Sequence, residues 1–314
     1  MKISFVGSGS VASNTAFISG IKCSFDEIVM LDIFEDFAKG KAIDLEQGLI
    51  LNGKNTKVIG TSDYKYIEGS DIIIITAGIA NKTSGASNRE SLLGKNKEII
   101  ADIANKLKQV ISTDEKQPLI IIVTNPIDII LKHFIETGNF NKRKTIGSGN
   151  WLDSARFKYY LSKEFNLDST KIETYVAGQH GQKMVYLLSQ TKINGQSLFD
   201  YIKEHKISEN KINEICEKAT KGAYEIINLI QKEGTIFGPA VSIYNIIESY
   251  LMDLKKMISI SIYCNGEYGI DNCCAGIPVL IGKNGVEEIC KFNITESEKK
   301  SIQASCEFMK EIDK

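Results

Sequence analysis

The chain has 314 residues, of which 43% are hydrophobic and 25% are charged, and these proportions are typical of a globular protein with a full core. Its 38 Lys and Arg residues balance 39 Asp and Glu residues, so a net charge of -1 supplies no long-range field for nucleic acid or an anionic membrane. The length suggests about two domains. We therefore expect a small-molecule protein with no nucleic-acid partner and no membrane partner.

The seven cysteines are scattered, without the C-x-x-C spacing of a zinc site or a redox pair. We therefore expect reduced thiols, no metal site and a cytoplasmic location. The adjacent Cys273 and Cys274 are predicted to be buried structural thiols, because no motif around them favours a reactive thiolate. Met1 runs directly into the apolar stretch ISFVG, so the start of the chain is predicted to be structure rather than a signal peptide.

In the first half of the chain, short β-branched runs alternate with longer helical stretches. This pattern is typical of βαβ units, and the continuous apolar runs indicate strands that are buried on both faces. Strands are expected at 2–6, 28–32, 57–60, 71–76 and 119–124. The clearest helix is expected at 88–112, where Leu and Ile recur at helical spacing. We predict an α/β fold that begins with a Rossmann doubly wound parallel sheet in residues 1–147.

The pattern becomes mixed after Gly147. Helices are expected at 151–165, 209–232, 239–255 and from about residue 295, and strands in the region up to 193, at 258–264 and at 278–282. Residues 148–314 are therefore predicted to form a mixed α+β catalytic domain. The active site is expected between the two domains, where ligand sites are common.

The segment GSGSVA at 7–12 lies between a predicted strand and a predicted helix, and Asp32 ends the next strand. This arrangement matches the dinucleotide-binding fingerprint. Gly7 allows the tight turn, Gly9 lets the backbone approach the pyrophosphate, and the helix N-terminus attracts the phosphates. Asp32 is expected to bind ribose hydroxyls and to repel a 2′-phosphate, which favours NAD over NADP. The alternative is a glycine turn in an ordinary βα unit.

A second group of residues carries acid–base character. His180 lies between glycines in AGQHGQ, and Asp153 and Arg156 are spaced i and i+3 on a predicted helix, so they share one face. The alternatives are a histidine satisfied in the core or at the surface, and a local helix ion pair that contributes only a few tenths of a kcal/mol.

Five motifs follow one another in the order and spacing of one family, namely GSGSV, TAG at 76–78, TNP at 124–126, IGSGNWLDSARF and AGQHG. From residue 1 to about 310 the chain resembles the L-lactate/L-malate dehydrogenase family, and its motifs are closest to L-lactate dehydrogenase. The resemblance implies an NAD-dependent oxidoreductase that acts on the CH–OH group of an L-2-hydroxy acid.

The resemblance also implies roles for single residues. His180 is the acid–base, Asp153 holds its second ring nitrogen, and Arg156 clamps the substrate carboxylate. These roles suit the groups, since imidazole titrates near neutral pH and only a guanidinium offers a bidentate fork. Arg89 would polarise the reacting carbonyl when the preceding loop closes. Asn125 would touch both substrate and cofactor, and Thr235 would line the substrate pocket.

The residues that the resemblance places at NAD come from the glycine turn and from the ends of the following strands. They are Gly7, Ser8, Gly9, Ser10, Val11, Asp32, Thr76, Ala77, Gly78, Asn96, Val123, Asn125 and Ser148. Family members are usually dimers or tetramers, so a homotetramer or homodimer is expected, with the helix KGKAIDLEQGLIL in the contact. The alternative for that helix is ordinary core packing.

Substrate choice in the family depends on one residue of the mobile loop, which is Gln in typical lactate enzymes and Arg in malate enzymes. Here the position holds Asn81, but the loop looks two residues longer than the common form, so Lys82 or Thr83 could occupy it instead. We expect lactate and pyruvate as the substrate pair. Malate, a bulkier 2-hydroxy acid and a catalytically idle NAD-binding sensor remain as alternatives.

Overall fold

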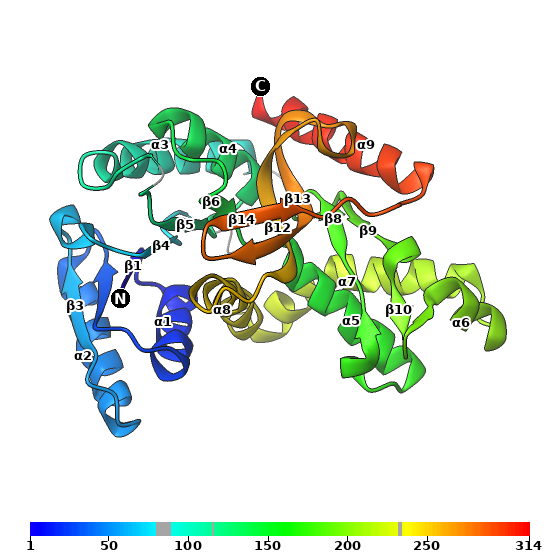
Figure 1. The fold of residues 1–314 in the computed structure, drawn as a ribbon, viewed down its shortest axis with the longest axis horizontal. Helices are drawn as coiled ribbons and strands as arrows, with labels where there is room; N and C mark the ends of the chain where they lie inside the picture. The colour runs from blue at the N-terminus through cyan, green and yellow to red at the C-terminus, as the bar shows by residue number, and fades with distance from the viewer. Residues whose placement is uncertain (80–88, 115, 232–233) are drawn as a thin grey trace.

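The computed structural model describes residues 1–79, 89–114, 116–231 and 234–314, with the backbone alone at 89–92. Within these residues one mixed sheet has eleven strands, in the order β3-β2-β1-β4-β5-β6-β12-β13-β8-β9, with β14 paired to β13 (Figure 1). Its strands are β1 (Lys2–Val6), β2 (Glu27–Leu31), β3 (Lys57–Thr61), β4 (Ile72–Ile75), β5 (Leu119–Ile122), β6 (Thr145–Gly147), β8 (Val176–Gly178), β9 (Met184–Tyr186), β12 (Lys256–Asn265), β13 (Asp271–Gly282) and β14 (Gly285–Ile289).

Smaller elements and helices surround this sheet. A second sheet in the described residues pairs β7 (Ile172–Glu173), β10 (Lys192–Ile193) and β11 (Gln196–Ser197). The helices are α1 (Ser10–Lys22), α2 (Glu35–Leu51), α3 (Arg89–Leu107), α4 (Ile127–Gly138), α5 (Asn150–Phe165), α6 (Leu198–Glu204), α7 (Glu209–Ile230), α8 (Phe237–Leu251) and α9 (Glu296–Asp313).

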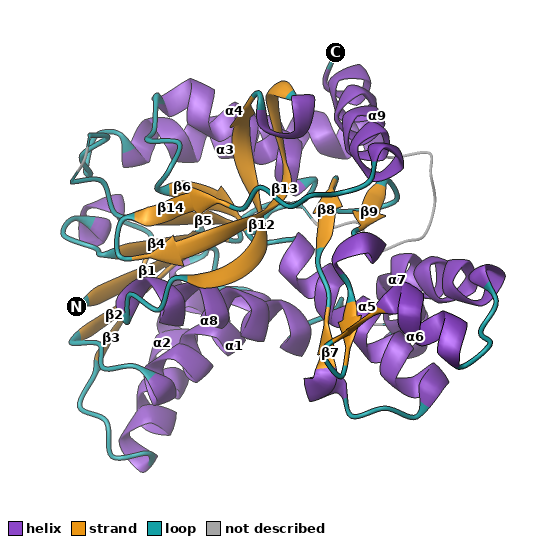
Figure 2. Ribbon diagram, turned by 45° about the vertical axis from the view of Figure 1, so that its right-hand side comes forward, coloured by secondary structure: helices purple, strands orange, loops and turns teal. Residues whose placement is uncertain are grey.

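The N-terminal strands β1 to β6 form the predicted Rossmann sheet. All their pairings are parallel, and the strand order reverses between β1 and β4. Helices α3 and α4 cover one face, while α1, α2 and α8 lie on the other (Figure 2). Because helices cover both faces of the sheet, the four side chains of Ile72–Ile75 are fully buried. A ligand site is expected where the order reverses, at the carboxyl ends of the strands.

The C-terminal half extends the same sheet with antiparallel strands. Strand β12 pairs with β6 and with β13, and β13 also pairs with β8 and β14. The predicted α+β character is confirmed, although β14 was not expected and β13 begins seven residues before the predicted start at 278. The last helix begins after Thr295, whose side chain forms a reciprocal capping box with Glu298.

The expectation that all the cysteines are reduced thiols is wrong. Cys273 on β13 forms a disulfide with Cys306 on α9, and the two Cα atoms are 6.5 Å apart. These residues are 33 positions apart and meet because α9 packs against β13, which spacing alone does not indicate. Cys274 is a free, buried thiol, as predicted.

In the described part of the chain, no helix combines the length and apolarity needed to cross a bilayer.

Candidate active site

The glycine turn after β1 packs against the TAG segment after β4. Gly7 has a φ of +97°, and a Cβ there would lie 2.7 Å from the backbone nitrogen of Ala77. Glycine is therefore required both for the backbone conformation and for the close approach. The Thr76 hydroxyl donates a hydrogen bond to the Gly7 carbonyl at 3.0 Å. Both segments thus lie together at the carboxyl ends of neighbouring strands.

The start of α1 suits a diphosphate. Gly9 occupies its N-cap without a side-chain hydrogen bond, and a Cβ on Gly9 would meet no atom within 4 Å. The first N–H groups of the helix are therefore open to an anionic ligand. At the end of β2, the Asp32 carboxylate accepts hydrogen bonds from the backbone N–H groups of Ser8 (2.9 Å) and Phe34 (3.1 Å). Open amides beside a carboxylate fit the pyrophosphate and ribose of NAD.

Asn96 connects the next two predicted cofactor segments. Its side chain is buried, accepts a hydrogen bond from the Ile79 N–H at 2.8 Å and donates one to the Asn125 carbonyl at 2.9 Å. The backbones of Val123 and Ser148 continue the ladder at the same end of the sheet, by bonds to Ile75 and Ile122. The structure therefore brings the predicted cofactor residues to one edge.

The residues that are predicted to carry acid–base chemistry and to bind the substrate form a connected cluster. Asp153 is fully buried on α5, where its Oδ2 lies 2.7 Å from His180 Nδ1 and its Oδ1 accepts a 3.0 Å hydrogen bond from Arg156 Nη1. The side chains of His180 and Arg156 are only 15% and 14% exposed. The i, i+3 pair is therefore more than a local ion pair, because the same carboxylate also orients a histidine from the segment after β8.

The charge state of His180 follows from these neighbours. Burial lowers the pKa of its imidazole, but the charge and hydrogen bond of Asp153 outweigh this effect and raise the pKa above its ordinary value. Near neutral pH the imidazolium is thus stabilised in a nearly enclosed position. Since Nδ1 faces Asp153, proton exchange with a ligand falls to Nε2.

Asp128 is a member of this cluster that sequence reasoning missed. It lies in the first turn of α4, accepts a hydrogen bond from the His180 backbone N–H at 2.8 Å and another from Ser261 Oγ at 2.6 Å. Burial raises the pKa of Asp128 to about 6. An acidic residue in a first helical turn usually indicates an interaction with the helix dipole. The available signal was its position two residues after the TNP segment.

The remaining predicted substrate residues are placed only in part. Asn81 lies outside the described residues, as do Lys82 and Thr83, and Arg89 begins α3 without a described side chain. Thr235 is half-buried just before α8, and Asn125 follows β5 with an exposed side chain. In the part of the chain that is described, no group of His, Cys, Asp and Glu side chains is arranged to hold a metal ion.

Comparison with known protein families identifies the family of this chain. Residues 1–147 match the model of the lactate/malate dehydrogenase NAD binding domain, and residues 151–314 match that of the lactate/malate dehydrogenase alpha/beta C-terminal domain. The chain belongs to the lactate/malate dehydrogenase family. It is therefore an NAD-dependent oxidoreductase that acts on the CH–OH group of a hydroxy acid, and the predicted family, fold class and cofactor are confirmed.

Similar proteins carry both substrate names. A malate dehydrogenase of Pelagibacter ubique is 39% identical over 98% of this chain and 95% of its own. Among solved structures, the malate dehydrogenase of Cryptosporidium parvum has a TM-score of 0.92 at 33% identity, with 99% of this chain and 97% of that chain covered. The lactate dehydrogenase of Cryptosporidium parvum, complexed with lactic acid and NAD, has a TM-score of 0.92 at 32% identity and covers 99% and 96%. Family membership alone does not choose between lactate and malate.

Proposed function

We propose that this family member interconverts a 2-oxo acid and an L-2-hydroxy acid, with pyruvate and L-lactate as its substrate pair. The cluster of His180, Asp153 and Arg156 carries the proposal, because it joins an acid–base to a carboxylate-binding group. NADH, when bound, supplies a hydride to the carbonyl carbon. The test is oxidation of NADH with pyruvate, and no oxidation with pyruvate or any other 2-oxo acid would contradict the proposal.

The proposed roles follow from the charges of the cluster. The Arg156 guanidinium binds the substrate carboxylate through N–H groups that Asp153 does not engage. The His180 imidazolium donates its Nε2 proton to the carbonyl oxygen, which becomes the hydroxyl. In the opposite direction the neutral imidazole accepts that proton. Asp153 faces the other ring nitrogen, Nδ1, and stabilises the imidazolium. Arg89 is proposed to polarise the carbonyl, and Asn125 and Thr235 to contact the substrate.

For the cofactor, we propose that the open amides at the start of α1 hold the pyrophosphate and that Asp32 holds the adenosine ribose. The other proposed contacts come from the glycine turn and the adjoining strand ends, namely Gly7, Ser8, Gly9, Ser10, Val11, Thr76, Ala77, Gly78, Asn96, Val123, Asn125 and Ser148. The fit of this edge to a dinucleotide supports the set.

The Asp32→Ala variant should discriminate less well between NADH and NADPH, because it removes both the ribose acceptor and the repulsion of a 2′-phosphate. The measurement is the ratio of kcat/KM for the two cofactors at a fixed concentration of 2-oxo acid. Glu35→Ala, three residues further on at the start of α2, is a matched control that removes a nearby carboxylate on the surface. If Asp32→Ala discriminates as strongly as the parent, Asp32 is not the ribose residue.

The choice of pyruvate rests on the cost of burying a second carboxylate. Oxaloacetate carries that group and pyruvate does not, and enclosing it without a cation costs several kcal/mol. Asn81 offers a neutral amide. We expect kcat/KM for pyruvate to exceed that for oxaloacetate by at least about tenfold, a margin that allows for hydrogen bonds from the amide. A higher kcat/KM for oxaloacetate would overturn this choice.

Malate is the second candidate, because the similar curated proteins are malate dehydrogenases. In that case Lys82 would pair with the second carboxylate, which the longer loop permits. Lys82→Gln should then abolish a preference for oxaloacetate while barely changing the kinetics with pyruvate. An unchanged preference in that variant would dispose of the lysine explanation as well.

We also propose a homotetramer or homodimer with α2 in the contact, a domain boundary at residue 147 and a cytoplasmic location. The exposed apolar side chains of α2 support the first point, since Ile43, Ile50 and Leu51 are 60%, 61% and 91% exposed. The mass of the native protein in solution tests the proposed oligomer, and the mass of a monomer would contradict it.

A further inference from the structure

The segment that carries His180 is anchored at two successive backbone amides by side chains from distant parts of the chain. The Gln179 N–H donates to Ser305 Oγ on α9 at 2.7 Å, and the His180 N–H donates to Asp128 Oδ2 on α4 at 2.8 Å. Both anchoring side chains are buried, at 2% and 3% exposure. The segment is therefore held from beneath by one neutral anchor and one anionic anchor.

The anionic anchor has its own support. Ser261 Oγ on β12, which is buried, donates to Asp128 Oδ1 at 2.6 Å, so each carboxylate oxygen accepts one hydrogen bond, from Ser261 and from the His180 backbone. These bonds favour the ionised form, whereas burial opposes it and raises the pKa of Asp128 to about 6. Above that pH the cluster around His180 therefore contains two carboxylates, Asp153 at the imidazole Nδ1 and Asp128 at the backbone of the same residue.

From this arrangement we propose that Asp128 is a positioning residue for His180, which fixes the backbone beneath the imidazole and holds a second negative charge beside it. The inference deepens the proposed function, on which it rests, by naming a residue that controls the proton donor without touching the substrate. A neutral anchor such as Ser305 could fix the backbone equally well. The charge is what distinguishes Asp128, because it stabilises the imidazolium that reduction of a 2-oxo acid requires.

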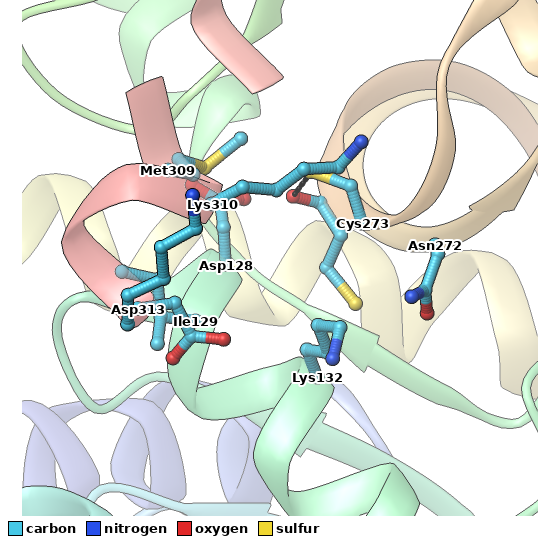
Figure 3. Close-up of a pocket in the computed structure, with 10 residues that line it drawn as sticks. Asp128, Ile129, Lys132, Asn272, Cys273, Met309, Lys310 and Asp313 are labelled. Atoms are coloured by element: carbon cyan, nitrogen blue, oxygen red, sulfur yellow. Dashed lines mark hydrogen bonds between the residues drawn. The ribbon is translucent and has the colours of Figure 1, made fainter. Parts of the chain in front are cut away.

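Several elements that pack around His180 and Asp128 bring other charged and titratable groups close to these two residues. Those around His180 are Asp153 and Arg156 on α5 and Asp128 itself. Those around Asp128 are Lys132 on α4, Cys264 on β12, Cys274 on β13, Lys310 and Asp313 on α9, and Lys314 directly after α9. Figure 3 shows Asp128 next to Met309 and Lys310, with Lys132 further along α4. These four side chains help to line a cavity of about 160 Å³. Burial raises the pKa of the Cys274 thiol, which is therefore neutral where His180 titrates.

The sign of the effect is defined. Loss of the Asp128 charge destabilises the imidazolium, so the pKa of His180 falls. Asp128→Asn keeps the size of the side chain and retains an oxygen for the His180 N–H, so it removes the charge and preserves the anchor. We expect the pKa of His180 to fall by about 0.5 or more. The pH at which kcat/KM for the 2-oxo acid declines on the alkaline side should fall by the same amount. At a fixed alkaline pH, kcat/KM should therefore be about threefold lower than in the parent.

The experiment is a titration of the full-length protein labelled with ¹³C at histidine Cε1, with and without NAD. The chain has three histidines, and the signal that disappears in His180→Asn assigns His180. Ser305→Ala is the matched control, because it removes the neighbouring anchor and no charge, so its His180 pKa should equal that of the parent. Ser261→Ala should shift the pKa in the same direction as Asp128→Asn but by less, since the remaining carboxylate is more easily protonated.

Three results separate this inference from the proposed function. An unchanged pKa of His180 in both Asp128→Asn and Ser261→Ala would overturn the inference whatever the activity. An equal shift in Ser305→Ala would also overturn it, because anchoring alone would then account for the effect. If Asp128→Asn does not fold, the shift in Ser261→Ala decides. Absence of turnover with every 2-oxo acid would instead contradict the proposed function, and the titration would remain informative.

Discussion

Replacing His180 by asparagine should lower kcat for the preferred 2-oxo acid by about 10² to 10⁴, while the affinity for NADH stays nearly unchanged. The amide cannot donate a proton with the pKa of an imidazolium, so the carbonyl oxygen loses its acid. The glycine turn and Asp32 lie at other strand ends and are left intact. Turnover is measured by absorbance of NADH, and its affinity by fluorescence titration.

Two outcomes of the His180 experiment are informative. Turnover close to that of the parent would contradict the assignment of the acid–base. A large loss of NADH affinity would show that the segment after β8 supports the cofactor site, and the loss of turnover would then not isolate proton transfer. His205→Asn is the control, because His205 is an exposed histidine just after α6, and this variant should leave kcat unchanged.

The second large effect is expected at Arg156. In Arg156→Lys one point charge replaces a planar fork, so about 1.5 to 3 kcal/mol of charge-assisted hydrogen bonding to the substrate carboxylate is at stake. We expect KM for the 2-oxo acid to rise about 10- to 150-fold. The guanidinium also donates to Asp153, whose other oxygen holds His180, so a smaller fall in kcat should accompany the rise in KM.

The control for Arg156 separates the substrate from the cluster. A titration of His180 in Arg156→Lys should show a pKa close to that of the parent, because lysine keeps the positive charge near Asp153. An unchanged KM would contradict the carboxylate clamp. A KM effect equal for pyruvate and for a substrate analogue without a carboxylate would contradict it too, since the fork would then act on another group.

Much of the fold could be predicted because its signals are local. The run Lys2–Val6 is a strand in both prediction and structure, and the predicted helix at 151–165 differs from α5 by one residue at its start. Strand β14 escaped prediction because GVEEI is short, has two charged residues and is stabilised by its pairing with β13. Strands β4 and β5 end before Thr76 and Thr124, whose hydroxyls bond to neighbouring loops across the strand ends.

The candidate site could likewise be predicted only where its signals are local. His180, Asp153 and Arg156 could be selected from their motifs, and the i, i+3 spacing placed the last two on one helix face. Asp128 could not be selected, because its proposed positioning role depends on Ser261 and on the His180 backbone, which are 133 and 52 residues away in sequence. The Cys273–Cys306 bond was missed for the same reason.

By itself, then, the sequence determined the parallel sheet and the dinucleotide turn, since periodicity and glycine placement act over a few residues. Its motifs, through the family resemblance, also selected His180, Asp153 and Arg156 as the residues that we propose for acid–base chemistry and substrate binding. Only the tertiary structure decided the electrostatic environment of His180. That environment depends on which side chains of α4, α5, β12 and α9 become buried next to it. Burial and charge interactions between distant segments exist only after the chain has folded, and they control the proton on the imidazole.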